Sequence, residues 1–172
     1  NTATFVLTGG TLVLLSNDSG GFLNISTVPS LRVHHMTFNT TSINNARSMR
    51  LTNVQGVFDH NSWIGTGASG VSLTNDIAGE QTGAPFATVG GTNSWASTLT
   101  FGSSAFLFFE NNTWSITGPP VEGTGIDSWG GARYVVRFNT MHAQGHLTHG
   151  ACSTAERGVL ATEAYGNVWD NT

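Results

Sequence analysis

The 172-residue chain contains no lysine. Its six arginines are outnumbered by ten carboxylates, and charged residues make up only 9% of the sequence. Nucleic acids and anionic membrane surfaces are recognised by clustered positive charge, which this composition does not supply. We therefore exclude nucleic acid and charged membrane surfaces as partners. The predicted surface is neutral and rich in hydroxyl groups, because serine and threonine together number 40.

Cysteine is almost absent as well. Cys152 is the single one, so an intramolecular disulfide cannot form. No apolar run approaches the roughly 20 residues that a membrane-spanning helix needs, and we expect no membrane span. The chain opens at Asn1 without an initiator methionine or a signal-peptide pattern, which favours a mature secreted chain or a piece of a longer protein. The lysine-free, hydroxyl-rich surface favours an extracellular or cell-surface location.

A short motif recurs along the sequence. An apolar run, a polar position and one further residue precede an asparagine in "FDHNSW", "FFENNTW", "VRFNTM" and "AYGNVW", and these asparagines are Asn61, Asn112, Asn139 and Asn167. The stretch "VHHMTF" places Met36 in the same slot, so the intervals are 25, 51, 27 and 28 residues. The long interval either contains a degenerate copy at Asn93 or carries a loop. Its turn-rich sequence favours a loop over about residues 64–98.

The residues before each asparagine alternate with a period of two, which is typical of a short strand with one buried face. No helical stripe extends for the ten or so residues that a helix needs. The copies return after 25 residues or more, long enough for each strand to lie parallel to its predecessor. The sequence therefore predicts an all-β solenoid of about five coils. The inward positions of four of these coils are Val33, Phe58, Phe109 and Val136.

Each repeated asparagine should occupy a tight bend, where it tolerates the left-handed backbone region and its amide bonds the neighbouring coil. The result would be an asparagine ladder. We expect a single domain over residues 1–172. In it, residues 1–30 form an N-terminal strand or cap, and residues 31–172 form the coils.

The stretches "GVFDHNSW" and "RYVVRFNTM" resemble coils of right-handed parallel β-helix proteins of the pectate-lyase-like superfamily, and the resemblance covers roughly residues 31–170. It implies a right-handed parallel β-helix. This scaffold carries lyases, hydrolases, epimerases, phage tailspikes and inert surface proteins. The stretch "GIDSWGGARYVVRFNT", followed by "LTHG" and "ERGVLATEAYGN", is similar to a functionally uncharacterised group of bacterial β-helix repeat proteins.

Stacking the copies predicts a column of outward-facing polar residues, namely His34, Asp59, Glu110, Arg137 and Tyr165. Two carboxylates beside an arginine could hold calcium or a uronate, or act as acid and base in glycoside hydrolysis. We therefore treat Asp59, Glu110 and Arg137 as catalytic candidates and the two carboxylates as candidate calcium ligands. The resemblance to pectate lyases implies that Asp59 lies near their calcium site. The alternative is that the column neutralises itself.

Two features of pectate lyases are missing from this sequence. No lysine is present to act as the base of β-elimination. The Arg-x-Pro-x-x-Arg pattern that supplies the catalytic arginine is also absent, because "TVPSLR" has Thr27 in the first arginine position.

A second candidate cluster lies in "MHAQGHLTHGACSTAERG" and contains His142, His146, His149, Glu156 and Arg157. Its histidines could bind a metal, act as a base or contact a sugar, or simply bond the backbone of a glycine-rich loop. Asp127 and Arg133 belong to the same coil, so we expect them near this cluster. The substrate-binding candidates from the column and this region are His34, Asp127, Arg133, His146 and His149.

The chain has five tryptophans. Trp63, Trp114 and Trp169 follow the ladder asparagines at one fixed position, with Phe38 and Met141 in the same alignment, which predicts a stacked row in the core. Trp95 and Trp129 fall outside this row. Flat indole faces bind sugar rings well, so we add these two to the saccharide-binding candidates.

Two functions follow from these patterns. The first is an extracellular module that binds, or binds and cleaves, a polysaccharide by lyase or glycoside hydrolase chemistry. The second is a non-catalytic structural or adhesive solenoid of a surface protein, fibre or filament. Terminal coils need a cover for their exposed core, and the sequence after Trp169 offers no capping segment. We therefore expect a fragment of a longer solenoid, or end-to-end self-association through the terminal coils.

Overall fold

The computed structural model describes residues 4–13, 23–39, 47–52, 54–66, 74–78, 106–117, 124–129, 132–142, 145–148, 159 and 161–170. These ranges contain fifteen β-strands and no helix. The strands are β1 (Thr4–Val13), β2 (Leu23–Ser26), β3 (Ser30–Asn39), β4 (Arg47–Thr52), β5 (Gly56–Asp59), β6 (Ser62–Thr66), β7 (Thr74–Ala78), β8 (Leu107–Glu110), β9 (Thr113–Thr117), β10 (Thr124–Trp129), β11 (Arg133–Arg137), β12 (Thr140–His142), β13 (Gly145–Thr148), β14 (Ala161–Tyr165) and β15 (Val168–Asp170). The predicted all-β class is confirmed.

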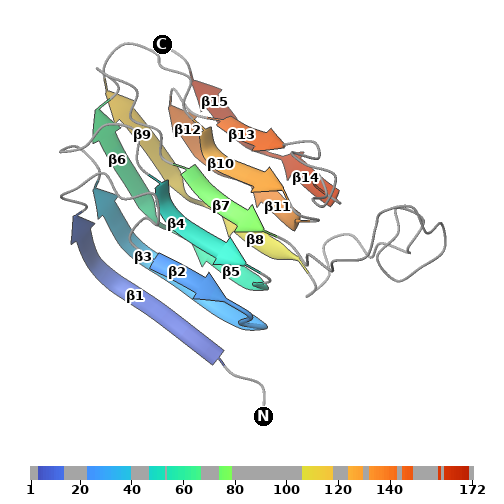
Figure 1. Cartoon of the computed structure of the whole chain (residues 1–172). Coiled ribbons are helices and arrows are strands. Elements are labelled where there is room, and N and C mark those ends of the chain that lie inside the picture. The colour runs from blue at the N-terminus through green and yellow to red at the C-terminus, as the bar shows by residue number, and fades with distance from the viewer. Residues whose placement is uncertain are drawn as a thin grey trace.

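Ten strands form one parallel sheet in the order β14-β11-β8-β5-β3-β6-β9-β12-β15, with β1 also paired to β3. Residues 31–34 of β3 pair with β5, whereas residues 37–39 pair with β6. Because β1 pairs along the whole length of β3, both β5 and β6 lie on the opposite edge of β3. The sheet thus has two wings, β5-β8-β11-β14 and β6-β9-β12-β15. Figure 1 shows the strands stacked in chain order.

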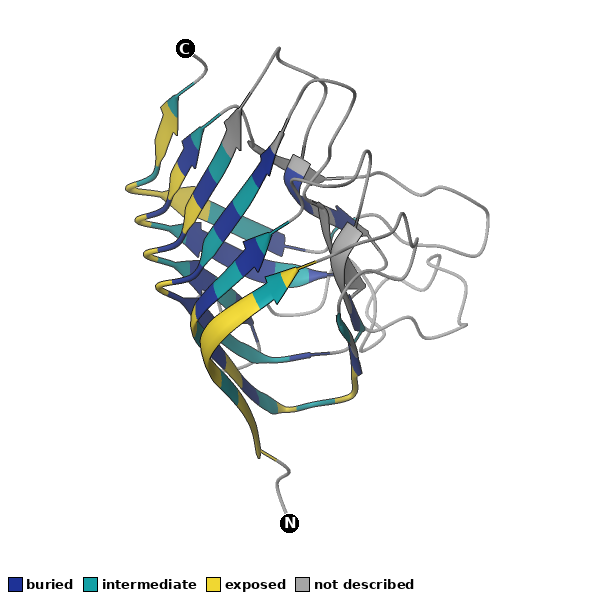
Figure 2. Cartoon of the chain, turned by 90° about the vertical axis from the view of Figure 1, so that its left-hand side faces the viewer, coloured by how far each residue is buried: buried dark blue, intermediate teal, exposed yellow. Residues whose placement is uncertain are grey.

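We call two strands a level when they are consecutive in the chain and lie one in each wing, as β5 and β6 do. The long strands β1 and β3 each form a level alone. The remaining strands form a second parallel sheet in the order β13-β10-β7-β4-β2, with one strand between successive levels. Figure 2 shows the two sheets as separate layers. Ile25, Leu51 and Ile126 of the second sheet share one buried cluster with the inward residues of the first.

The inward positions stack as the alternation of apolar residues predicts. Val33 pairs with Phe58, Phe58 with Phe109, and Phe109 with Val136. All four side chains are fully buried. Neighbouring parallel strands lie about 4.8 Å apart, so each of these side chains packs directly on the next. The predicted inner column is confirmed.

The long interval of 51 residues between Asn61 and Asn112 connects two adjacent levels, because β5 pairs directly with β8. The stretch expected to be a loop nevertheless contains strand structure. β6 extends to Thr66, and β7 supplies a strand of the second sheet. The expected long loop over about residues 64–98 thus includes the end of β6 and the strand β7, which the sequence analysis did not predict. Asn93 and Trp95 lie outside the described residues.

The asparagine ladder is present in the turn between the two wings. The Oδ1 atom of Asn112 accepts hydrogen bonds from the backbone N and from Nδ2 of Asn61, both at 2.9 Å. Its Nδ2 donates to Phe58 O at 2.9 Å and to Asn139 Oδ1 at 3.0 Å. The amide group thereby satisfies the backbone of the bend and joins successive levels.

The sequence analysis predicted that the asparagine of each bend has the left-handed backbone conformation. In the structure, the residue before the ladder position has it instead. His35, His60, Asn111 and Phe138 have φ between 55° and 57°, and Gly166 has φ 65°. The asparagine itself must keep its amide pointing inward to form the ladder, so the preceding residue takes up the reversal of the chain. The prediction of a bend was right and its placement was wrong by one residue.

The aromatic row packs in the core as expected, except at its last member. The rings of Trp63 and Trp114 stack with centroids 4.4 Å apart and planes within 5°, and Phe38 stacks on Trp63 at 4.9 Å. Trp169 lies in register with Met141 but is 45% exposed. Its prediction as a buried core residue was wrong, because no described strand lies beyond β15 to cover it.

Candidate functional site

The outward polar column has the register that the stacking of repeats predicts. His34 pairs with Asp59, Asp59 with Glu110, Glu110 with Arg137, and Arg137 with Tyr165. Thr8 of β1 precedes His34 in the same column. Asp59, Glu110, Arg137 and Tyr165 each end their strand, whereas Thr8 and His34 lie midway along β1 and β3, which continue through the bend. The parallel register therefore brings polar side chains from six levels into one line.

Asp59 is held by two residues that the sequence analysis did not select. Arg32 Nε donates to Oδ1 at 3.1 Å, and Arg32 Nη2 donates to Oδ2 at 3.0 Å. His60 Nδ1 lies 3.1 Å from Oδ2. Arg32 is two residues before His34 on the same face of β3, so its side chain reaches diagonally to the next level. That spacing was the available signal for this contact.

Asp59 is buried, and its side chain is 7% exposed. Burial alone would raise the pKa of Asp59, but hydrogen bonds from Arg32 and His60 and the charge of Arg32 lower it below the ordinary value of 3.8. Both carboxylate oxygens are engaged by donors of the protein. Asp59 is therefore an ionised, neutralised group at neutral pH.

Glu110 has a corresponding partner one level further on. Arg137 Nε donates to Glu110 Oε2 at 2.6 Å, and Arg137 Nη1 donates to the Tyr165 hydroxyl at 3.0 Å. The Arg137 guanidinium also lies 5.1 Å from the centre of the Phe108 ring. The hydrogen bond to Tyr165 and, against the opposing effect of burial, the interactions with Glu110 raise the pKa of Arg137. Arg137 thus links three levels of the outer face.

Histidines fill the start of the column and the adjoining bends. The Nδ1 atoms of His34 and His35 lie 2.8 Å apart, and Thr8 Oγ1 lies 3.3 Å from His34 Nδ1. The rings of His35 and His60 stack with centroids 5.2 Å apart and planes within 3°. Sequence reasoning placed His34 on the outward face and His35 at the turn, but it did not predict their contacts with each other or with His60. The described ranges contain no group of three or more His, Cys, Asp or Glu residues arranged to hold a metal ion.

The remaining candidate residues do not join this column. Asp127 and His146 lie on the adjacent strands β10 and β13 of the second sheet, and Trp129 ends β10. Arg133 begins β11 in the first sheet and is half-buried. His142 pairs across β12 and β15 with Asp170, with Nδ1 3.4 Å from Oδ2.

Several candidates of the histidine-rich segment and one tryptophan cannot be placed. Trp95, His149, Glu156 and Arg157 lie outside the described residues. The structure places Asp127 and His146 on neighbouring strands of the second sheet, where His146 is in register with Ile126 and Asp127 with Leu147, and it places the charged column on the other sheet.

Part of the outer face is covered rather than open. Val135 lies in an outward register position next to Phe108, yet it is fully buried. It forms a small apolar cluster with Phe106 and Ala161, against which Phe108 packs. One oxygen of Glu163, the register partner of Val135, is buried and has no hydrogen-bond partner in the structure. On the outer face of this wing, the row beside the charged column is apolar at Val57, Phe108 and Val135 and ends at Glu163.

Fold and site together define an all-β protein built from parallel strands, with a buried asparagine ladder and a self-paired charged column. Comparisons with models of known protein families, with curated proteins and with solved structures each find no match to this chain. In the part of the chain that the structure describes, no helix has the length and apolar character needed to cross a membrane.

Proposed function

We propose that this chain is a right-handed parallel β-helix module that works as a non-catalytic scaffold at the cell surface or outside the cell. The parallel order of both sheets and the recurrence of one bend support the β-helix. The resemblance of its repeats to the pectate-lyase-like superfamily supports the same fold and its right hand. The lysine-free, hydroxyl-rich composition supports the location.

The scaffold role rests on one observation, the pairing of both column carboxylates with arginines of the same face. A general base must reach a substrate proton with a free oxygen and works best with a pKa near the working pH. Asp59 has both oxygens engaged and a lowered pKa, so it meets neither condition. A calcium site would need six or more oxygen ligands, and both oxygens of Asp59 already accept hydrogen bonds from Arg32.

Polysaccharide turnover tests this proposal directly. Purified protein would be incubated with pectate, alginate and neutral glucans, with and without calcium, and assayed for unsaturated products and for new reducing ends. We expect no turnover above a heat-inactivated control. Turnover that Glu110→Gln or Asp59→Asn abolishes, while Thr113→Ser at an exposed position of β9 does not, would overturn the scaffold role in favour of an enzyme.

Saccharide binding without cleavage is the second candidate. The exposed rings of Phe138 and Tyr165 lie edge to face with centroids 5.6 Å apart, and Tyr165 also contacts Arg137. An aromatic face beside a fixed guanidinium suits a neutral or acidic sugar ring. A glycan array would test saccharide binding. We expect the Tyr165→Ala variant to give a weaker binding signal than the unmodified chain, and the Glu110→Gln variant to give the same signal. A signal indifferent to Tyr165 would exclude this site.

A further inference from the structure

Each residue of the outer column is followed directly by the left-handed residue of the bend. Successive side chains of a regular strand point to opposite faces, so two neighbours in sequence do not meet. The positive φ of the bend removes this separation. At the level of β5 it brings His60 Nδ1 to 3.1 Å from Asp59 Oδ2, and at the level of β3 it brings His34 and His35 together.

The pair on β3 consists of two imidazole rings whose nitrogens face each other. The Nδ1 atoms of His34 and His35 lie 2.8 Å apart, and the rings meet edge to face with centroids 5.1 Å apart. Two nitrogens that lie about 2.0 Å from one metal ion and at right angles to each other are about 2.8 Å apart. The two Nδ1 atoms therefore have the separation of neighbouring ligands in a square-planar metal site.

The bend and the next level fix the position of His35. Met36 N donates to Asn61 Oδ1 at 3.0 Å, which holds the backbone one residue further along. The His60 ring stacks on the His35 ring with planes within 3°, and the contact with Asp59 orients the His60 ring in turn. A ligand that is already held in place loses little freedom when an ion binds.

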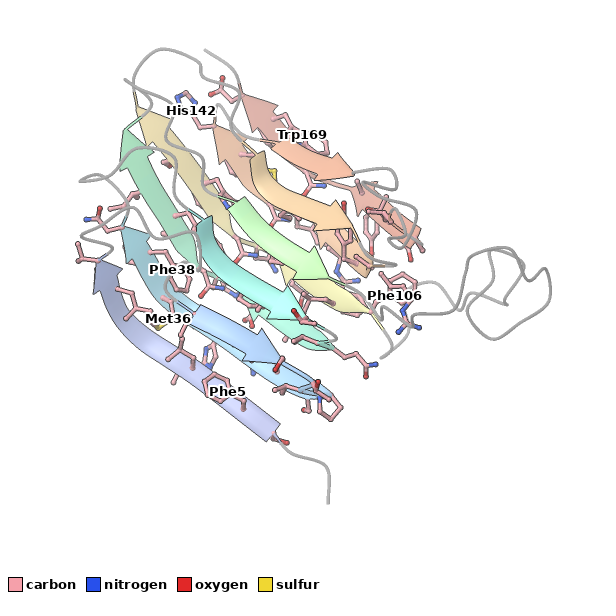
Figure 3. The ribbon with its side chains drawn as sticks, viewed as in Figure 1. Phe5, Met36, Phe38, Phe106, His142 and Trp169 are labelled. Carbon is pink, nitrogen blue, oxygen red and sulfur yellow. The ribbon has the colours of Figure 1, made fainter. Side chains whose placement is uncertain are left out.

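The level of β1 leaves the pair accessible. Its bend position is Gly9, and a Cβ atom placed there would have no heavy atom of the described residues within 4 Å. Thr8 Oγ1 lies 3.3 Å from His34 Nδ1 and offers a neutral oxygen beside the pair. Figure 3 shows Met36, the residue after His35, toward the β1 end of the stack of strands. The pair is thus covered by β5 on one side and open on the other.

The ligands available here suit a metal ion that prefers nitrogen. Asp59 does not join them, because both of its oxygens accept hydrogen bonds from Arg32. Within the described ranges no group of three or more His, Cys, Asp or Glu residues is arranged to hold an ion, so the pair supplies two ligands. Imidazole suits Cu²⁺, Ni²⁺ and Zn²⁺, whereas Ca²⁺ and Mg²⁺ prefer oxygen. Among these ions Cu²⁺ binds nitrogen most tightly and prefers a tetragonal arrangement.

We propose that His34 and His35 bind a Cu²⁺ ion through their Nδ1 atoms, with solvent or an external ligand in the remaining positions. Without metal, one ring donates a hydrogen from Nδ1 to the other. Binding transfers that hydrogen to Nε2 of the same ring, frees both Nδ1 lone pairs and releases no net proton. This site goes beyond the scaffold role and does not depend on it.

A copper titration tests the proposal. The full chain, without a polyhistidine tag, would be titrated by calorimetry beside the end-blocked peptide LRVHHMTF, residues 31–38, which carries the same two histidines without the fold. We expect the chain to bind Cu²⁺ at least about tenfold more tightly than the peptide, because the bend positions both rings. Pulsed electron paramagnetic resonance should detect two imidazole nitrogens on the bound ion. Equal affinities, or a single nitrogen, would show that the histidines only bond each other and would overturn the proposal.

Two variants locate the ion. His34→Gln and His35→Asn each remove one ligand, and asparagine tolerates the left-handed bend. Each should weaken copper binding by about tenfold or more and leave one imidazole nitrogen in the spectrum. Circular dichroism would verify that both variants are folded. The nitrogen count of the unmodified chain keeps the proposal testable if either variant is not.

The second histidine-rich segment provides the control. A double variant, His146→Gln with His149→Gln, should keep both the affinity and the two-nitrogen spectrum of the unmodified chain. Copper binding that this variant loses and His34→Gln retains would place the ion in that segment and would overturn the proposal.

Discussion

The asparagine ladder lies in the bends, two residues after the charged outer column, and the two satisfy their polar groups by different means. Asn61, Asn112 and Asn139 are each 1% exposed, and identical amides bond to one another and to the backbone. The column uses different residues at each level and lies partly in solvent, with the Arg137 side chain 31% exposed. A repeated amide can bond to its own copy, because it is both donor and acceptor.

A charged residue cannot repeat in this way. Like charges stacked at strand spacing repel each other. The charges of the column must therefore alternate in sign, or a residue at a neighbouring position on the same face must pair with them. Glu110 is followed by Arg137, whereas the neighbours Asp59 and Glu110 have the same sign, and Arg32 compensates Asp59 from outside the column. The comparison teaches that the ladder specifies the fold and the column adjusts to it.

The largest effect should come from breaking the ladder. Asn112→Ala leaves the N and Nδ2 of Asn61 and the carbonyl of Phe58 buried without partners. We expect the free energy of unfolding to fall by about 1–3 kcal/mol. Urea denaturation followed by tryptophan fluorescence would measure it.

The adjacent asparagine is a matched control. Asn111 is exposed and has φ 56°, a region in which glycine is at ease. Asn111→Gly should leave the free energy of unfolding within about 0.5 kcal/mol of that of the unmodified chain. Similar losses for the two variants would show that the ladder amides contribute no more than an ordinary surface asparagine.

Sequence reasoning reached the ladder because a period of two and a recurring asparagine are local signals that every level repeats. It did not identify Arg32 or His60 as partners of Asp59, because the diagonal contact of Arg32 and the orientation of the adjacent His60 ring both depend on the folded arrangement. The burial of Val135 was equally hidden. It depends on Phe106, nearly thirty positions earlier in the chain, lying over the outer face. Interactions between residues at the same position of successive repeats were predictable from the sequence. Interactions between residues at different repeat positions required the structure.

The next largest effect should come from the buried end of the column. Asp59→Asn removes the charge that Arg32 and His60 share while keeping the shape of the side chain. Because Arg32 remains half in solvent, we expect a loss of only about 1 kcal/mol at pH 7. Val57→Thr, on the same strand, serves as a conservative control in the urea experiment. A loss of stability as large as that of Asn112→Ala would mean that the charged column contributes as much to stability as the asparagine ladder.

The same carboxylate should give the column a pH dependence that the ladder lacks. Asp59 has its pKa lowered in the folded state, so its contribution is present above the ordinary value of 3.8 and is lost as the pH falls through the lower, folded value. The difference in stability between the unmodified chain and Asp59→Asn should therefore be constant from pH 7 to about 5 and shrink below about pH 4. The difference for Asn112→Ala should not change over that range. A constant Asp59→Asn difference down to pH 3 would contradict the lowered pKa.

The smallest effect should come from the exposed pair further along the column. Glu110 and Arg137 lie partly in solvent, where water and salt compete with the ion pair. Glu110→Gln should cost about 0.2–1 kcal/mol, and the loss should diminish in 1 M sodium chloride. Arg137→Gln should cost slightly more, because it also removes the hydrogen bond to Tyr165 and the contact with the Phe108 ring. The double variant measures the coupling. A coupling well above 1 kcal/mol that salt leaves unchanged would mean that this pair is as essential to the stack as the ladder.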